Sequence, residues 1–119
     1  MRWNPGTKYR NQRTEIDGIK FDSKGEANRW CELKLMEKAG QITNLRRQIA
    51  WELIPNQYAV VEGRRKCVER RVTYVADFVY QRGEELIVED YKGIETEAFK
   101  IKKKMMRWLF GIEVRLTRG

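Results

Sequence analysis

The chain has 119 residues, with 25 Lys and Arg against 17 Asp and Glu, and its formal net charge is +8. This surplus favours a polyanionic partner, nucleic acid first and an anionic membrane surface second. The sequence contains no His, which excludes Ser-His-Asp and Cys-His catalysis and His-based zinc hydrolysis. Any hydrolytic chemistry therefore has to come from carboxylates, Lys and a hard metal ion.

The length fits one domain, which we expect over residues 16–119, after a basic N-terminal arm at residues 1–15. No apolar run approaches the ~18 residues that a membrane span requires, and the first residues lack the apolar segment of a signal peptide. We therefore expect a cytoplasmic protein with no membrane partner and no small-molecule cofactor. Cys31 and Cys67 are too few for a zinc site or a disulfide framework.

The first predicted elements are a short hairpin and a helix. Asp17-Gly18 is typical of a hairpin turn. The helix is predicted from about residue 23 to 39, because Ser23 is a good N-cap and Glu26, three residues later, completes a capping box. On this interpretation alone, Glu26 serves only to begin the helix.

The rest of the chain predicts strands and a second helix. We predict strands at 48–54, 71–80, 85–92 and 112–116, an extended piece left open at 57–61, a charged turn at 62–66 and a helix at 96–110. The order α-β-β-β-α-β indicates an α/β fold with a mixed central sheet flanked by helices. Three large aromatic residues are expected in the core: Trp30, Trp51 and Trp108.

Two acids and a lysine are predicted to meet on this sheet. Residues two apart in a strand point to the same side, so Asp90 and Lys92 share a face. A turn near residues 81–84 would pair the two central strands and put Asp77 roughly opposite Asp90. Two carboxylates beside an ammonium group suit phosphodiester hydrolysis, in which a divalent ion polarises the phosphate and a lysine stabilises developing negative charge. The plain alternative is a solvated strand face with an ion pair between Asp90 and Lys92.

These residues resemble the PD-(D/E)xK nuclease superfamily. The pattern here is Ala76-Asp77 followed by Asp90-Tyr91-Lys92. The segment Ser23-Lys24-Gly25-Glu26-Ala27 is similar to the N-terminal helix motif of phage junction resolvases and transposon-end nucleases. Over roughly residues 13–117, the whole pattern looks like a family of small phage-encoded nucleases.

The resemblance implies a restriction-endonuclease-like core and a set of site residues. Glu26, Asp77 and Asp90 would be metal ligands, and Lys92 would position the attacking water. Mg²⁺ is the implied cofactor, with Mn²⁺ as a substitute. Glu89 is an alternative ligand if its strand bulges, and Gln48 resembles a Gln that some relatives place near the site.

Clustered cations suggest where DNA would bind. Backbone contacts are expected from these side chains: Lys24, Arg46, Arg47, Lys100, Lys102, Lys103 and Lys104. Two further basic groups, at 64–66 and 70–71, extend the same field. The basic helix has a plainer interpretation as a solvent-exposed face.

The sequence thus predicts a Mg²⁺-dependent DNA endonuclease. Charge spread over several elements favours backbone and shape recognition, so branched DNA such as a Holliday junction is the expected substrate, with a homodimer placing two sites on two strands. The alternatives are a non-catalytic nucleic-acid-binding protein on a nuclease-like fold and, third, a ribonuclease.

Overall fold

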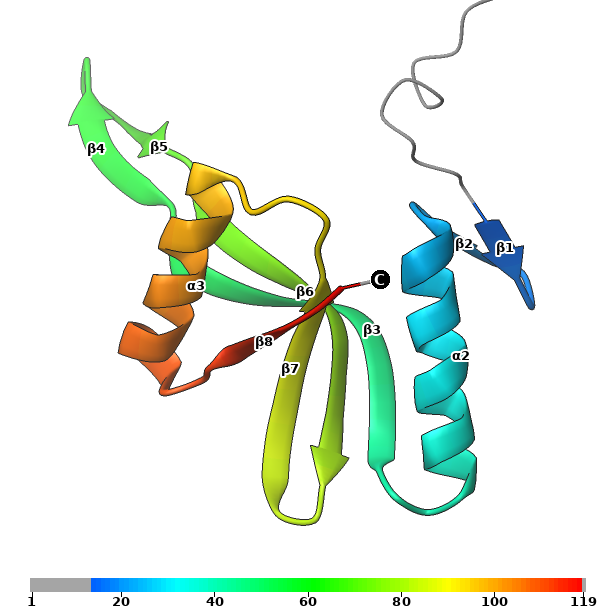
Figure 1. Cartoon of the computed structure of the whole chain (residues 1–119). Coiled ribbons are helices and arrows are strands. Elements are labelled where there is room, and N and C mark those ends of the chain that lie inside the picture. Colours follow the sequence, from blue (N-terminus) through cyan, green and yellow to red (C-terminus); the bar gives the residue numbers. More distant parts are fainter. Residues whose placement is uncertain (1–13, 119) are drawn as a thin grey trace, which may run out of the picture.

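The computed structural model describes residues 14–118, and almost all of the predicted N-terminal arm, residues 1–13, lies outside this range. A four-stranded mixed sheet is the centre of the molecule (Figure 1). Its strands, in spatial order, are β3 (Thr43–Ile54), β6 (Val72–Arg82), β7 (Glu85–Tyr91) and β8 (Val114–Thr117). The first three pair antiparallel, whereas β8 is parallel to β7. The protein is therefore a mixed α/β protein.

One helix packs on each face of this sheet. Helix α2 (Lys24–Lys38) buries Trp30 and Leu33 against Phe78 and Ile87 of the sheet. Helix α3 (Glu97–Phe110) buries residues such as Met106 in a second cluster on the other face. The core elements follow the chain order α2-β3-β6-β7-α3-β8, which agrees with the predicted α-β-β-β-α-β.

Capping residues fix where the helices begin and end. The Ser23 hydroxyl accepts a hydrogen bond from the Glu26 backbone N–H at 3.1 Å, and Thr96 serves Phe99 in the same way at the start of α3. Gly111 ends α3 in the left-handed region, with φ 67°, a conformation that glycine adopts without steric cost. Both helix predictions are confirmed within one residue at each end.

Two hairpins lie outside the central sheet. The first joins β1 (Thr14–Ile16) to β2 (Ile19–Phe21), with the predicted turn at Asp17-Gly18. The second joins β4 (Gln57–Val61) to β5 (Arg64–Glu69). The predicted charged turn at 62–66 was wrong in extent, because Glu62 and Gly63 alone make the turn, with φ 51° and 77°.

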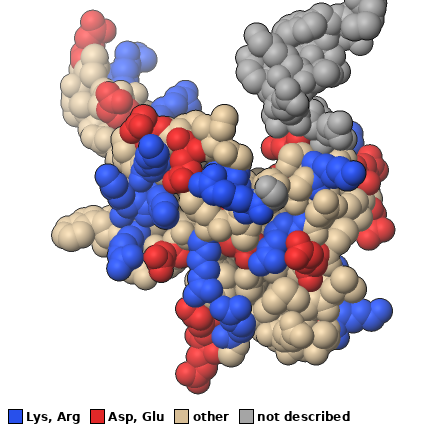
Figure 2. Space-filling view, viewed as in Figure 1, with Lys and Arg blue, Asp and Glu red and all other residues tan. Residues whose placement is uncertain are grey.

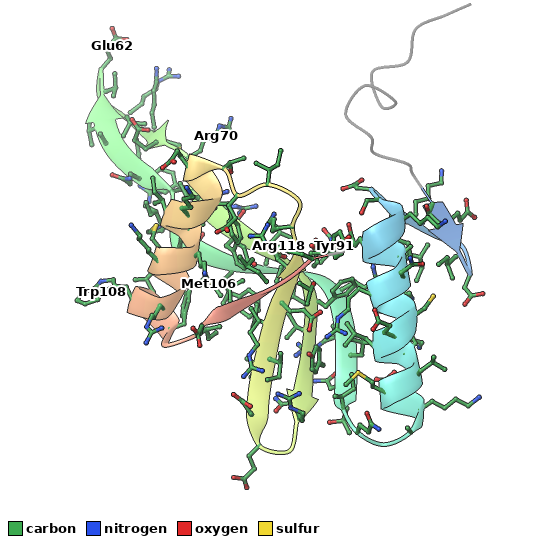
Figure 3. The ribbon with its side chains drawn as sticks, viewed as in Figure 1. Glu62, Arg70, Tyr91, Met106, Trp108 and Arg118 are labelled. Carbon is green, nitrogen blue, oxygen red and sulfur yellow. The ribbon has the colours of Figure 1, made fainter. Side chains whose placement is uncertain are left out.

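The structure corrects two further predictions. Strand β3 begins at Thr43 and not at residue 48, because pairing with β6 holds its charged first half in extended conformation. Trp108 is not a core residue: it is 86% exposed and points away from the body, whereas Met106 faces the sheet (Figure 3). Two residues apart on a helix differ by about 200° in direction, so both cannot face the core.

Candidate functional site

Asp77 and Asp90 meet where β6 and β7 stop pairing. The last backbone pair of the two strands is Phe78 with Glu89. Beyond it, Asp90 Oδ1 accepts a hydrogen bond from the Asp77 backbone N–H at 2.7 Å, and Asp77 Oδ2 accepts from the Tyr91 backbone N–H at 2.9 Å. Each carboxylate therefore bonds the backbone of the opposite strand, and the predicted position of Asp77 opposite Asp90 is confirmed.

Tyr74 and Lys92 both approach the other oxygen of Asp90. This side chain is 1% exposed. Its Oδ2 accepts a hydrogen bond from the Tyr74 hydroxyl at 2.5 Å, and the Lys92 Nζ lies 3.8 Å away. Burial and the bond to Asp90 raise the pKa of Tyr74, so the phenol keeps its proton and remains a donor. The prediction that Asp90 and Lys92 share a face is confirmed, and the Lys92 Nζ also lies 4.6 Å from the centre of the Phe99 ring.

Glu26 adds a third acid, from the first turn of α2. It is 7% exposed, and an Arg47 guanidinium nitrogen lies 3.7 Å from its Oε2. Burial raises the pKa of Glu26 to about 7, with the negative charges of Asp77, Asp22 and Asp90 adding to the effect and Arg47 opposing it. Glu26 therefore caps the helix through its backbone and also lies within the electrostatic field of the two strand acids.

Asp77 shows the same crowding of negative charge. Burial and the neighbouring charge of Asp90 raise its pKa to about 6, and the Tyr91 N–H and Lys92 oppose the rise. Three carboxylates with one lysine and one arginine nearby carry a net negative charge. Burying like charges together is costly unless a cation joins them.

Gln48, which the resemblance singled out, does reach the site. Its Nε2 donates to Asp77 Oδ1 at 3.3 Å. Gln48 has φ 53° in the middle of β3, a conformation that is uncommon outside glycine and that breaks the alternation of the strand. The register of β3 and β6, in which Arg47 pairs with Phe78 and Ile49 with Ala76, places Gln48 opposite Asp77.

Glu89, the alternative ligand, belongs to a different cluster. It is 2% exposed and accepts two hydrogen bonds from the Arg29 guanidinium, at 2.6 and 3.0 Å, and one from the Tyr80 hydroxyl at 2.6 Å. Arg29 lies on α2, so Glu89 is directed to the opposite face of the sheet from Asp90. The structure does not bring Glu89 to the site.

Gly25 and Tyr91 bring α2 against the site. A Cβ atom at Gly25 would overlap the hydroxyl and ring of Tyr91, so the helix and β7 approach this closely only because residue 25 has no side chain. Tyr91 stands between Asp90 and Lys92, and Gly25 precedes Glu26. Sequence reasoning missed this contact, although a glycine in the first turn of a helix is a recognisable signal of close packing.

The carboxylates of Glu26, Asp77 and Asp90 are chemically suited to bind a divalent cation. Carboxylate oxygens are the ligands that Mg²⁺ prefers, and the raised pKa values of Glu26 and Asp77 show negative charge that a cation would neutralise. Within residues 14–118, no three acidic or Cys side chains are grouped closely enough to hold an ion in their present positions. The Asp77 backbone N–H donates a hydrogen bond directly to the Asp90 carboxylate, whereas Glu26 is linked to the two strand acids by its electrostatic field alone.

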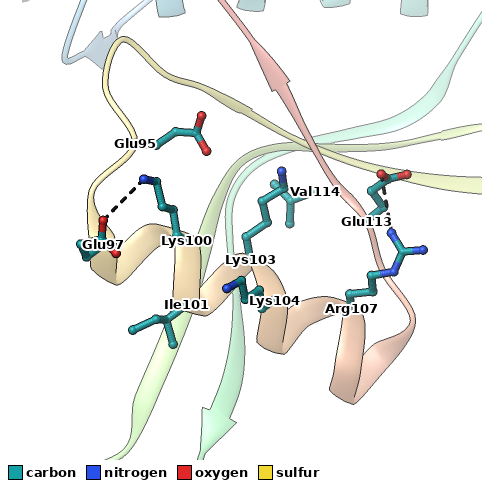
Figure 4. A pocket seen from close by; sticks show the side chains of 9 residues that line it. All are labelled: Glu95, Glu97, Lys100, Ile101, Lys103, Lys104, Arg107, Glu113 and Val114. Atoms are coloured by element: carbon teal, nitrogen blue, oxygen red, sulfur yellow. Dashed lines mark hydrogen bonds and ion pairs between the residues drawn. The ribbon is translucent and has the colours of Figure 1, made fainter.

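The predicted DNA-binding residues differ in their accessibility. Lys and Arg side chains gather over α3 in Figure 2, and Lys100, Lys103 and Lys104 line a shallow hollow between α3 and β8 (Figure 4). Lys102 does not line this hollow. Lys24 is exposed, and the Arg46 Nε donates to the Asn44 carbonyl at 3.3 Å.

Arg47 has a more internal position than a DNA-binding residue would need. Its guanidinium lies 4.4 Å from the Phe21 ring centre and close to Glu26, and its buried Nε has no hydrogen-bond partner among the described residues. Its neighbours indicate that Arg47 positions Glu26.

The fold and the site thus define a mixed α/β protein with buried acids and a lysine at the meeting point of two central strands. Residues 6–118 match the model of a family described as "Protein of unknown function (DUF1064)", and the chain belongs to this family. Neither a curated protein nor a solved structure matches the chain. No helix within the described residues 14–118 is long and apolar enough to cross a membrane.

Proposed function

We propose that this protein is a metal-dependent endonuclease that hydrolyses phosphodiester bonds in DNA. The observation that carries the proposal is the hydrogen bond from the Asp77 backbone N–H to the buried Asp90 carboxylate at the end of two paired strands, with Lys92 Nζ 3.8 Å from Asp90. The core order α2-β3-β6-β7-α3-β8 and the spacing of these residues support a restriction-endonuclease-like core.

Asp77 and Asp90, with Glu26 from α2, would hold Mg²⁺, or Mn²⁺ as a substitute. The ion supplies polarisation of the phosphate and a water nucleophile at neutral pH. Asp90 is held in place by the Tyr74 hydroxyl, and Asp77 by the Gln48 amide and the Tyr91 N–H. Fixed ligands of this kind keep their geometry when charge changes around them.

Lys92 contributes a positive charge on the face of the sheet that carries Asp90. Its ammonium group packs against the Phe99 ring and close to Asp90, so its position is restricted. In the proposed reaction it donates a hydrogen bond to the attacking water and stabilises the negative charge that develops on the phosphate.

The distribution of cations supports a structure-selective substrate. Four basic side chains against three acidic ones line the hollow of Figure 4, and three more cations lie on β5 of the β4–β5 hairpin, which favours contacts to the DNA backbone over the reading of bases. We therefore propose branched DNA, such as a Holliday junction, as the substrate, cut by a homodimer that presents one site to each of two strands.

A cleavage panel tests the proposal. Duplex, single-stranded, flap and four-way-junction DNA are incubated with the full chain and MgCl₂, MnCl₂ or EDTA. We expect metal-dependent cleavage of at least one form, and we expect Asp77→Asn to lower the rate by about a hundredfold or more, since loss of even an outer-shell metal partner costs 10–100-fold. Lys92→Met should lower it by about 10²–10³-fold, as for a lost charge-stabilising donor.

Glu52→Gln is the matched control. It removes one negative charge from an exposed position of β3, and it should cut as the wild type does. DNA binding with a steep salt dependence but no metal-stimulated cleavage would refute the nuclease and favour the non-catalytic alternative. Preferential cleavage of RNA in a competition assay would instead make the protein a ribonuclease.

A further inference from the structure

The β4–β5 hairpin is the most exposed element of the described chain. Every residue of β4 and of β5 is exposed, and the hairpin extends away from the sheet and both helices (Figure 1). A two-stranded hairpin in water is only marginally stable by itself. Because the residues of this hairpin are not part of the core, we looked for a binding role that would account for it.

The hairpin is nevertheless well built. Glu62 and Gly63, both with positive φ, form a two-residue turn, the type that matches the twist of the strands. At the base, the Asn56 side-chain oxygen accepts a hydrogen bond from the Arg71 backbone N–H at 2.6 Å. Ile54 and Val72, which pair across the strands at the base of the hairpin, pack against the same core cluster as α3. The ribbon is therefore clamped to the sheet at its root.

The positive charge of the hairpin is concentrated on β5, and its two acids, Glu62 and Glu69, lie at the turn and at the end of β5. Arg64, Arg65 and Lys66 are consecutive, and cross-strand pairing places Val60 with Arg65 on one side of the ribbon, and Ala59 with Lys66 and Val61 with Arg64 on the other. Paired residues share a side, so both sides carry cations. Neither side offers the unbroken apolar face that packing onto a protein core requires.

Arg65 is also oriented. Its guanidinium carbon lies 3.9 Å from the centre of the Tyr58 ring, so the group stacks on the aromatic face. A stacked guanidinium keeps its N–H groups free at the edge, where they fit phosphate oxygens. Arg70, at the base of the hairpin, is exposed in the same way (Figure 3).

We propose that the β4–β5 hairpin is a DNA-binding ribbon that lies in the major groove of a duplex arm, with Arg64, Arg65 and Lys66 on the phosphates. The proposal rests on the proposed function for its choice of DNA as the polyanion. The major groove is about 12 Å wide and admits a two-stranded β-ribbon. Long Arg and Lys side chains on both sides of such a ribbon extend toward the two backbones that border the groove.

The dimensions set where the duplex lies. A strand rises about 3.3 Å per residue, so the five residues from Val72 at the root to Asp77 along β6 span about 17 Å. DNA rises about 3.4 Å per base pair, so the ribbon contacts duplex about five base pairs or more from the scissile phosphate. The hairpin therefore supplies a second point of attachment, separate from the site.

Equilibrium binding without metal tests the ribbon. A fluorescent 30-base-pair duplex is titrated with the full chain in EDTA at several salt concentrations. We expect Arg64→Gln/Arg65→Gln/Lys66→Gln to weaken binding by roughly 10- to 100-fold and to reduce the slope of log K against log salt by about 2–3, as for three lost phosphate contacts. Arg64→Lys, which keeps the charge and leaves the stacked Arg65 in place, should retain binding within about threefold.

The matched control is Lys20→Gln/Lys34→Gln/Lys38→Gln. It removes three exposed cations from β2 and α2, and it should leave the slope near the wild-type value. Equal loss in both triple variants would overturn the ribbon and leave only a general positive field. Methyl green, a major-groove dye, should compete with the protein; competition by netropsin alone would overturn the groove assignment.

Two outcomes separate this inference from the proposed function. Duplex binding that depends on the hairpin, in a protein that cuts no DNA, would sustain the ribbon and refute the nuclease. Metal-dependent cleavage with wild-type binding in the hairpin variant would refute the ribbon alone. A hairpin variant whose sedimentation shows a lost dimer, with the salt slope unchanged, would make the hairpin a protein interface and overturn the proposal.

Discussion

Glu89 and Asp90 are consecutive residues of β7, and both carboxylates are almost completely buried. They point to opposite faces of the sheet and have different neighbours. Glu89 accepts two hydrogen bonds from the Arg29 guanidinium and one from Tyr80. Asp90 lies against a second acid, Asp77, and its nearest cation is Lys92, 3.8 Å away.

This difference separates a structural acid from acids that are suited to bind a cation. Glu89 is neutralised by a two-pronged contact, which satisfies both of its oxygens. Around Asp90, burial and the charges of neighbouring acids raise the pKa of Asp77 to about 6 and that of Glu26, on α2, to about 7. The fold thus keeps surplus negative charge in the acid group formed by Glu26, Asp77 and Asp90, whereas it neutralises Glu89.

The largest expected effect on stability comes from changing Glu89, the acid that is neutralised by Arg29. Glu89→Gln removes the closest and most buried ion partner of the Arg29 guanidinium, which should lower the free energy of unfolding by about 3 kcal/mol. Asp77→Asn removes one of two repelling charges and should leave stability at pH 8 unchanged or higher. Urea unfolding of both variants measures the difference, and an equal loss in the two would break the comparison.

The pH dependence of stability should show the raised pKa values of Glu26 and Asp77 in the acid group. Glu26 ionises near pH 4.5 in the unfolded chain and at about 7 in the folded one. Between these values the folded state binds more protons, so stability falls as pH rises, by about 3 kcal/mol for 2.5 pKa units. Asp77, raised from 3.8 to about 6, acts in the same direction between those two values.

Glu26→Gln isolates the contribution of one acid. Its stability relative to the wild type should increase from pH 4.5 to pH 7 and then stay constant. Glu52→Gln, at an exposed position of β3, should follow the wild-type curve. A constant difference between Glu26→Gln and the wild type over the whole range would show that Glu26 ionises normally in the folded protein.

Magnesium should remove part of this penalty. If the ion binds the folded acids alone, a concentration ten times its Kd stabilises the protein by about 1.4 kcal/mol, which appears as a higher Tm at pH 8. Asp77→Asn should lose most of the increase, and Glu89→Gln should keep it. An equal rise in Tm in both variants would mean that the ion binds somewhere other than the acid group of Glu26, Asp77 and Asp90.

The parts of this arrangement that the sequence predicts are those that depend on local geometry. The alternation of a strand puts Asp90 and Lys92 on one face, and a short turn between β6 and β7 puts Asp77 opposite Asp90. The extent of β3 depends on pairing with β6, and β5 has the composition of a charged loop, so neither follows from local pattern.

Contacts between distant segments were harder to predict. The meeting of Gly25 and Tyr91 joins residues 66 positions apart by number, and no periodicity reports it. Nor does hydrophobicity indicate that Trp108 would be exposed, since an aromatic residue on a helix is as suited to a core as to a surface that binds another molecule.

The smallest expected effect on stability comes from Gly25, and it tests how α2 and β7 are brought together at the acid group. Gly25→Ala places a methyl group where the Tyr91 ring lies, so the ring has to move, at a cost of about 1 kcal/mol or more. Because Tyr91 is between Asp90 and Lys92 and its N–H bonds Asp77, the displacement should also lower the rate of cleavage and weaken the magnesium-induced rise in Tm.

A double-mutant cycle distinguishes this contact from a general effect on the helix. Alanine favours helices more than glycine by about 1 kcal/mol, so Gly25→Ala should stabilise the protein once the ring is removed, in the Tyr91→Ala background. A sign that changes between the two backgrounds measures the coupling between α2 and β7. The same loss of stability in both would mean that the methyl group meets something other than Tyr91.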